Sequence, residues 1–192
     1  MAQRCVPGRC FQVRLPAAAR AAYDRGPATA ETAMTIRVGD RIPPATLNVL
    51  DGGVKPIETA TIFDGRKVVL FCVPGAFTPT CSERHLPGYV ERHAEFRARG
   101  IDVACIAVND AFVMDAWAKS QGVPEGMRML ADGNGDFTRA LGLEMDATKY
   151  GMGVRGRRYA LYAEDGMVRH LAVEAPGEFK VSSAEAMLAA IG

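Results

Sequence analysis

Residues 67–81 read KVVLFCVPGAFTPTC, and this stretch determines the class of fold that we expect. Its first part, Lys67–Val73, is a continuous apolar run that is typical of a strand buried on both faces. A Pro-Gly turn follows it. If Thr78 is the N-cap of the next helix, Pro79 occupies the first helical position, where a missing N–H costs nothing, and Cys81 lies in the first turn. The stretch therefore predicts a buried strand that leads into a helix with a cysteine near its start.

Strands and helices alternate through the rest of the chain. Short apolar or alternating runs predict further strands at 46–50, 54–57, 101–108, 127–131, 159–163 and 167–173. Helical spacing and capping residues predict helices over 89–99, 111–121 and 136–141 and from Ser182 or Ser183 to Ile191. This alternation predicts an α/β fold in which helices flank a mixed central sheet.

Local signals add detail to this outline. The turn sequences Asp51–Gly53 and Glu164–Gly166 each join two strands as a hairpin. Pro87–Gly88 is expected to interrupt the helix that begins near Cys81. In the helix over 111–121, the residues expected on the apolar face are Phe112, Val113, Ala116 and Trp117. Gly151–Gly156 matches GxGxxG, but a strand follows it instead of a helix, so we interpret it as a loop.

Length and charge limit the classes of function. The chain has 192 residues, which suits one domain with a modest extension. Its 23 basic and 22 acidic side chains leave a net charge of +1 and no strong field for a polyanion. The longest apolar run is far shorter than the roughly 20 residues that span a bilayer. We therefore expect neither nucleic acid nor a membrane as a partner.

The cysteines indicate a reducing compartment. There are five, an odd number, with no CxxC pair and no short metal-type spacing, so neither a disulfide scaffold nor a metal site is expected. A cytoplasmic location fits best. Each cysteine is then either a small buried residue or a reactive thiol.

The N-terminal segment, residues 1–33, differs from the rest. It carries five arginines against two acids, and its prolines and lack of an apolar face predict a disordered basic extension. One interpretation is a transit segment for a mitochondrion or plastid. The other, which we favour, is an extension upstream of a true start at Met34. Either way, one domain is expected over 34–192.

Cys81 is the strongest candidate for chemistry, because thiolates are stabilised at helix N-termini and beside cations. The sequence around it, PGAFTPTC at 74–81 followed by SERHLPG at 82–88, resembles the peroxidatic motif of type II peroxiredoxins, which include atypical two-cysteine and glutathione- or glutaredoxin-dependent members. The resemblance continues through VNDAFVM (108–114), WAK (117–119), LADG (130–133), RRYAL (157–161) and EF (178–179). It thus covers about residues 36–192.

This resemblance implies a thioredoxin-like fold and a thiol peroxidase that reduces hydrogen peroxide and alkyl hydroperoxides without metal, flavin or haem. Cys81 would attack the terminal peroxide oxygen and become a sulfenic acid. Thr78 would hold the peroxide in line and Pro74 would shield the sulfur. The resemblance places the site arginine directly before an aromatic residue, which here makes it Arg158; since neighbours on a strand face opposite ways, Arg157 would point elsewhere.

The step that regenerates the thiol has two candidate routes. Cys105 follows Cys81 by 24 positions, near where some type II relatives carry a resolving cysteine. Alternatively Cys105 is a core residue, as we expect for Cys72, and glutathione or glutaredoxin reduces Cys81 directly. The expected reductant of the cycle is glutathione with glutaredoxin, or thioredoxin. We favour this external route.

Other features carry weaker expectations. His85 lies one helical turn after Cys81 and could pair with it as a base, but the resemblance implies a structural role. The resemblance also implies a homodimer face around 74–77 and 110–117. An alternative function is a peroxide-sensing relay or binding protein on the same fold.

Overall fold

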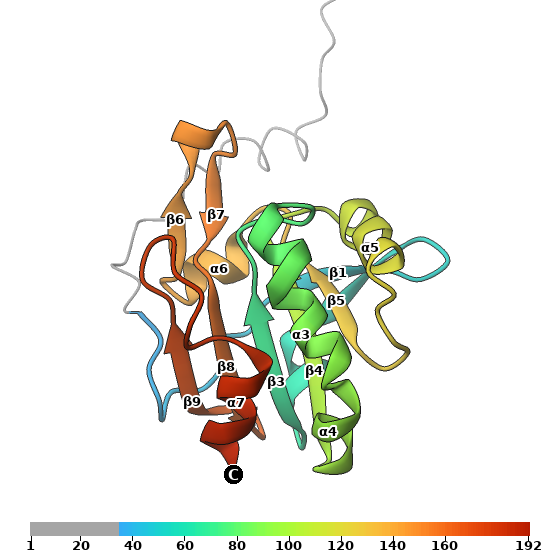
Figure 1. Ribbon diagram of the computed structural model, residues 1–192, viewed down its shortest axis with the longest axis vertical. Coiled ribbons are helices and arrows are strands. Elements are labelled where there is room, and N and C mark those ends of the chain that lie inside the picture. Colours follow the sequence, from blue (N-terminus) through green and yellow to red (C-terminus); the bar gives the residue numbers. More distant parts are fainter. Residues whose placement is uncertain (1–34) are drawn as a thin grey trace, which may run out of the picture. The chain divides into compact units, whose positions relative to one another are not determined.

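The computed structural model describes residues 35–192, so the expectations for 1–33 and Met34 fall outside the described residues. A seven-stranded sheet in the order β2-β1-β5-β4-β3-β8-β9 forms the centre of this part (Figure 1). Its strands are β1 (Thr46–Leu50), β2 (Val54–Glu58), β3 (Lys67–Cys72), β4 (Ile101–Ala107), β5 (Arg128–Ala131), β8 (Tyr159–Glu164) and β9 (Met167–Val173). The neighbours β3, β4 and β5 run parallel and the other pairs are antiparallel, so the predicted mixed sheet is confirmed.

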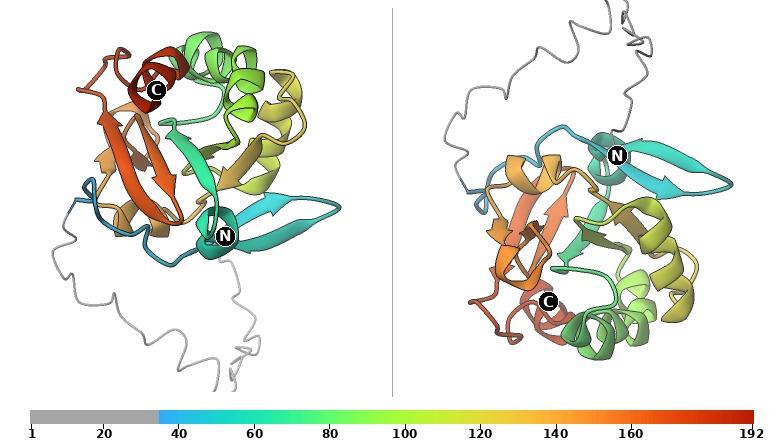
Figure 2. Two further views of the ribbon diagram at one scale, coloured as in Figure 1. Left: turned by 90° about the horizontal axis from the view of Figure 1, so that it is seen from below. Right: turned by 90° about the horizontal axis from the view of Figure 1, so that it is seen from above.

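Helices cover both faces of this sheet, as Figure 2 shows from below and above. The helices are α2 (Thr59–Phe63), α3 (Leu86–Glu91), α4 (His93–Ala98), α5 (Ala111–Ser120), α6 (Asp136–Ala140) and α7 (Ala184–Ile191). One core lies between the sheet and α3, α4, α5 and α7, and a second lies between the sheet and α2 and α6. None of these helices in residues 35–192 is long and apolar enough to cross a membrane.

The burial of the central strand β3 explains why its sequence is a continuous apolar run. Val69 and Phe71 point into the first core, whereas Val68, Leu70 and Cys72 point into the second. All five have no exposed surface. A strand buried on both faces has no polar side, which explains the continuous apolar run.

Both predicted hairpins are confirmed. Residues 51–53 join β1 to β2, and Asp165 and Gly166 join β8 to β9. The two residues of the second turn have φ of 49° and 73°, the left-handed geometry that matches the twist of a tight hairpin.

The helix after Cys81 corrects one expectation, because Pro87–Gly88 does not interrupt it. Helical backbone continues from Pro79 to Glu91, and the break comes at Arg92. The reason is a π-helical turn, η1 (Cys81–His85), in which the Leu86 N–H donates to the Cys81 carbonyl five residues back. Pro87 then lies at the start of α3, where it needs no N–H partner.

The buried face of α5 is also different from the expected one. Phe112 is 64% exposed and Ala116 is exposed, while Met114 and Trp117 are buried. Asp110 caps this helix by accepting a hydrogen bond from the Val113 N–H at 2.9 Å. In so short a helix the apolar residues fit two faces, and only packing selects one.

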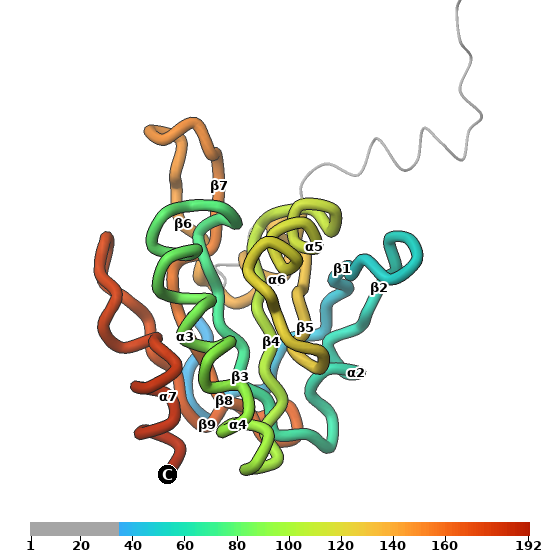
Figure 3. The backbone as a smooth tube through the Cα atoms, turned by 45° about the vertical axis from the view of Figure 1, so that its right-hand side comes forward, coloured from blue at the N-terminus to red at the C-terminus, as the bar shows by residue number. Residues whose placement is uncertain are grey.

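Four short elements have no counterpart in the predictions. These are α2 and a small hairpin of β6 (Glu144–Asp146) and β7 (Val154–Gly156), joined around the 3₁₀ turn η2 (Thr148–Tyr150). The hairpin projects beyond the end of the main sheet in Figure 3. Part of the segment interpreted as a loop is therefore strand β7, whose three residues are too few to show an alternating pattern.

Candidate active site

Strand pairing brings three distant segments together at one edge of the sheet. Cys72 at the end of β3 pairs with Tyr159 at the start of β8, and Tyr159 pairs with Val173 at the end of β9. The segments that follow β3, precede β8 and follow β9 therefore all meet there, at the top of the sheet in Figure 1. These segments carry Cys81 and Arg158.

The loop that leads from β3 to Cys81 is held by the neighbouring strand. The Val73 N–H donates to the Ile106 carbonyl at 3.1 Å, and the Ala76 N–H donates to Asn109 Oδ1 at 3.1 Å. Both acceptors belong to β4 or the segment after it. The loop is thus fixed to the parallel part of the sheet.

Thr78 occupies the predicted N-cap position, but its hydroxyl has a different partner. Its carbonyl accepts the first helical hydrogen bond from the Ser82 N–H at 3.0 Å, as expected for an N-cap. Its hydroxyl donates to the Gly75 carbonyl at 2.9 Å. A tight turn over 75–78 brings that carbonyl within reach, and a Cβ on Gly75 would lie 3.3 Å from the Thr78 methyl group.

Phe77, in the same turn, has a left-handed backbone with φ of 61° and a side chain that is 56% exposed. Such a conformation costs about 1–3 kcal/mol for a residue other than glycine, and strained residues of this kind cluster at active sites and ligand clamps. Pro74 is half-buried at the start of this loop.

Arg158 is in direct contact with Cys81. Its Nη2 donates to Cys81 Sγ at 3.4 Å, and Cys81 has no exposed surface. A guanidinium is charged at all relevant pH values, so the contact places a permanent positive charge beside the sulfur. Arg157 points elsewhere, with its Nη2 3.4 Å from the Glu174 carbonyl. The structure therefore brings Arg158, and not Arg157, to the cysteine.

His85 connects Arg158 to Ser182 through its two ring nitrogens. Arg158 Nη1 is 2.9 Å from His85 Nδ1, and His85 Nε2 is 3.0 Å from the Ser182 carbonyl. A guanidinium can only donate, so Nδ1 accepts and the ring proton is on Nε2, where it donates to Ser182. Burial, reinforced by the charge of Arg158, lowers the pKa of His85 to about 3. Both nitrogens of this neutral ring are occupied, which favours a structural role over that of a base for Cys81.

Aromatic side chains surround this histidine. The Phe179 ring lies 4.9 Å from His85 and 5.7 Å from the Arg158 guanidinium carbon. The Tyr89 hydroxyl donates to the Ser182 carbonyl at 2.9 Å. The sequence patterns did not indicate Tyr89 and Ser182 as parts of this site and gave Phe179 no role. No local pattern could have found them, because Ser182 is more than 90 positions from both His85 and Tyr89.

The single tryptophan lies next to the reactive helix. Trp117 is buried, and its Nε1 donates to Ser82 Oγ at 3.0 Å, directly beside Cys81 in sequence. Its fluorescence is therefore a natural reporter of changes at Cys81.

The other two described cysteines lie inside the sheet. Cys72 and Cys105 have no exposed surface, and both are free thiols, as is Cys81. Cys105 lies in the same core as Cys81, whereas Cys72 lies in the core on the opposite face. Burial raises the pKa of both strand cysteines well above the usual range of a thiol.

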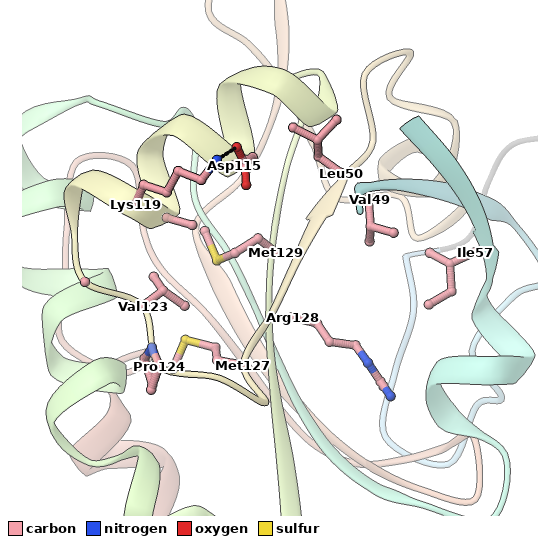
Figure 4. A pocket seen from close by; sticks show the side chains of 12 residues that line it. Val49, Leu50, Ile57, Asp115, Lys119, Val123, Pro124, Met127, Arg128 and Met129 are labelled. Atoms are coloured by element: carbon pink, nitrogen blue, oxygen red, sulfur yellow. Dashed lines mark hydrogen bonds and ion pairs between the residues drawn. The ribbon is translucent and has the colours of Figure 1, made fainter. Parts of the chain in front are cut away.

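A groove away from Cys81 is a different feature. It has a volume of about 600 Å³ and lies between the β1–β2 hairpin, α5 and β5 (Figure 4). Val49, Ile57 and Met129 line it, with the ion pair of Lys119 and Asp115 at its side. Neither Cys81 nor its polar contacts line this groove, so it is separate from the candidate site. Within residues 35–192, no group of three potential metal ligands lies together.

Comparison with known proteins defines the family. The family model described as Redoxin matches residues 37–188. The chain is 50% identical over 176 residues to "Peroxiredoxin-2E, chloroplastic" of Arabidopsis thaliana, an alignment that covers 88% of this chain and 75% of that protein. It is 45% identical to "Peroxiredoxin-2B" of the same plant, covering 81% of this chain and 98% of the relative.

A solved structure agrees with these sequence relatives. Reduced Prx3 of Vibrio vulnificus in complex with H2O2 has 50% sequence identity and a TM-score of 0.79, and the match covers 82% of this chain and 100% of that one. The chain belongs to the redoxin family, whose fold is thioredoxin-like, and within it to the type II peroxiredoxins. Its activity is that of a thiol-dependent peroxidase.

Proposed function

We propose that this peroxidase reduces hydrogen peroxide and alkyl hydroperoxides at Cys81. The Cys81 thiolate attacks the terminal peroxide oxygen, the O–O bond breaks, and the departing oxygen leaves as water or an alcohol after taking up a proton. The sulfur is oxidised to a sulfenic acid as the peroxide is reduced. The observation that carries this proposal is the 3.4 Å contact between Arg158 Nη2 and Cys81 Sγ.

The residues around the sulfur have distinct roles in this proposal. Arg158 stabilises the thiolate and the negative charge that develops on the departing oxygen. Thr78, whose hydroxyl is fixed on the Gly75 carbonyl, holds the peroxide in line with the sulfur. Pro74 covers the site from the start of the loop and offers no competing N–H. Since Cys81 has no exposed surface, the peroxide reaches it only as these half-buried side chains open.

We assign regeneration to an external thiol, namely glutathione with glutaredoxin, or thioredoxin. The sulfenic acid condenses with that thiol, water leaves, and exchange with a second thiol releases Cys81. Cys105 is a poor resolving residue, because burial raises its pKa and its strand is paired on both sides, with Phe71 and with Met129. A disulfide between Cys81 and Cys105 would require Cα atoms within about 7 Å of each other, or else local unfolding of the helix start or of β4.

The assembly that we propose is a homodimer. Phe77 and Phe112 are 56% and 64% exposed, and the loops before them are joined by the hydrogen bond from Ala76 N–H to Asn109 Oδ1. Two exposed aromatic rings on linked segments are typical of an interface.

The cysteine content supports a reducing compartment such as the cytoplasm. In this proposal, residues 1–33 are an extension outside the domain.

Peroxide consumption by wild type, Cys81→Ser and Cys105→Ser tests this function. Each protein is assayed with glutathione plus glutaredoxin and separately with thioredoxin. We expect Cys81→Ser to lose all activity and Cys105→Ser to keep it with at least one reductant. Full activity in Cys81→Ser would overturn the assignment of Cys81, and loss in Cys105→Ser with both reductants would overturn the external route. Oxidation of Cys81 without turnover by any reductant would indicate a peroxide-sensing relay instead.

A further inference from the structure

Glu174 is a buried carboxylate beside the active site for which the proposed reaction has no use. It follows β9 directly and is 4% exposed. Its Oε1 accepts four hydrogen bonds of 2.8 Å, from the N–H groups of Lys180, Val181 and Ser182 and from the Ser182 hydroxyl. Burial alone would raise the pKa of Glu174, but these hydrogen bonds outweigh it and lower the pKa, so the group is ionised at neutral pH.

These hydrogen bonds fold the segment 174–182 back on itself. The fold of the segment determines where the Ser182 carbonyl lies, and that carbonyl accepts from both His85 Nε2 at 3.0 Å and the Tyr89 hydroxyl at 2.9 Å. The same segment carries Phe179, whose ring packs against His85. Glu174 thus fixes the position of the segment 174–182, whose residues Phe179 and Ser182 contact His85.

The chain of contacts continues to the reactive sulfur. With its Nε2 proton bound to Ser182, the His85 ring can only accept at Nδ1, and there it receives Arg158 Nη1 at 2.9 Å. The other terminal nitrogen of Arg158 is then directed at Cys81 Sγ, at 3.4 Å. A second contact reaches Arg158 through the backbone, because the Glu174 N–H donates to the Arg158 carbonyl at 2.9 Å.

We propose that Glu174 is a positioning residue of the peroxidase, which sets the orientation of Arg158 toward Cys81 through the Ser182 carbonyl and His85. It does not touch the peroxide. This inference rests on the proposed roles of Cys81 and Arg158. Its physical basis is that a flexible arginine stabilises a reacting charge only if its own hydrogen bonds hold it in place beforehand.

Glu174→Gln tests the inference, because it removes the charge and keeps the size of the side chain. The rate of Cys81 oxidation by hydrogen peroxide is measured in a single turnover through Trp117 fluorescence, so that no reductant takes part. We expect a rate about 10-fold to 100-fold below wild type, the loss typical of removing a group that holds a reactive side chain. The matched control is Glu178→Gln in the same segment, an exposed carboxylate whose partner is the Lys180 ammonium at 2.7 Å. This control should react at the wild-type rate.

Two readouts separate positioning from a merely structural effect. In an Arg158→Met background, Glu174→Gln should have no further effect on the rate, since there is no guanidinium left to orient; equal losses in both backgrounds would overturn the proposal. The ¹⁵N shifts of the His85 ring should show the Nε2–H tautomer in wild type and a tautomer mixture in Glu174→Gln. An unchanged His85 spectrum in a slow variant would also overturn it.

Ser182→Ala provides a second test if Glu174→Gln folds poorly. Ser182→Ala removes only one of the four donors to Glu174 and should slow oxidation by a smaller factor, about threefold. Wild-type rates in a folded Glu174→Gln or in Ser182→Ala would contradict the inference. Failure of the proposed function itself looks different, because Cys81→Ser would then retain the oxidation signal of wild type.

Discussion

The helix start at Cys81 differs from the strands β3 and β4, which carry Cys72 and Cys105. The difference lies in the polar contacts of the cysteines and not in their exposure. All three cysteines have no exposed surface. Cys81 is in contact with the Arg158 guanidinium. For the two strand cysteines, burial is the largest influence on the pKa and raises it. The cation that it contacts, and not its burial, therefore distinguishes Cys81 from the other two thiols.

Selective oxidation is the largest effect that the comparison predicts. One equivalent of hydrogen peroxide should yield a sulfenic acid on Cys81 and none on Cys72 or Cys105, with rates that differ by at least about a thousandfold, because the strand cysteines react only when the protein opens. Trapping with dimedone followed by peptide mass spectrometry measures this. Comparable labelling of Cys105 in the folded protein would remove the distinction between the two regions.

Replacing Arg158 should reduce the difference in oxidation rate between Cys81 and the two strand cysteines. Arg158→Met is expected to slow Cys81 oxidation by about 100-fold to 1,000-fold, the range for losing a donor aimed at developing charge. Stopped-flow Trp117 fluorescence provides the rate. Arg157→Met is the matched comparison and should lose far less, since Arg157 contacts the Glu174 carbonyl and not the sulfur. Equal losses in the two variants would contradict the assignment of Arg158.

The packing role of Cys72 can be tested through its neighbour Gly156. A Cβ at Gly156 would lie 2.6 Å from Cys72 Sγ, so Gly156→Ala should reduce the free energy of unfolding by about 1–3 kcal/mol. Combining it with Cys72→Ala should recover part of that loss. Gly88→Ala is the control, because a Cβ at Gly88 meets no atom within 4 Å and the residue lies in helix α3. Urea denaturation is measured for wild type, Gly156→Ala, Cys72→Ala, the double variant and Gly88→Ala. Additive losses in the double variant would show that the two residues do not interact.

The smallest effect is a pH dependence of stability that comes from His85. Its pKa is lowered from 6.5 to about 3 in the folded protein, so between these values the unfolded state binds more protons. The contribution of neutral His85 to the free energy of unfolding is therefore fully present above pH 6.5 and is lost as the pH falls toward 3. Between about pH 7 and about pH 5 the unfolding free energy should decrease by at most about 1.4 kcal/mol per pH unit.

His85→Gln should flatten this dependence, and His170→Gln on β9 should not. Urea denaturation at a series of pH values provides the slopes. The same slope in wild type and His85→Gln would mean that His85 is not held neutral by the fold.

The sequence alone determined most of the architecture. Continuous apolar runs predicted β3 and β4, turn residues predicted both hairpins, and the Pro-Gly turn with Thr78 and Pro79 predicted a helix that starts just before Cys81. These signals are local: each depends on residues within one element or one turn. The family resemblance then supplied the choice of Arg158 over Arg157, which strand alternation alone left open.

Only the tertiary structure decided the polar contacts of the site and the details that depend on packing. Phe112 fits a helical face as well as Met114 does, and the π-helical turn that accommodates Pro87 leaves no sequence pattern. Glu174 and Ser182 reach the site only because β9 ends beside the start of β8. Hydrogen bonds between residues more than 70 positions apart depend on the pairing of strands across the whole sheet. Local periodicity records which face of an element is buried, but it does not record what that face meets.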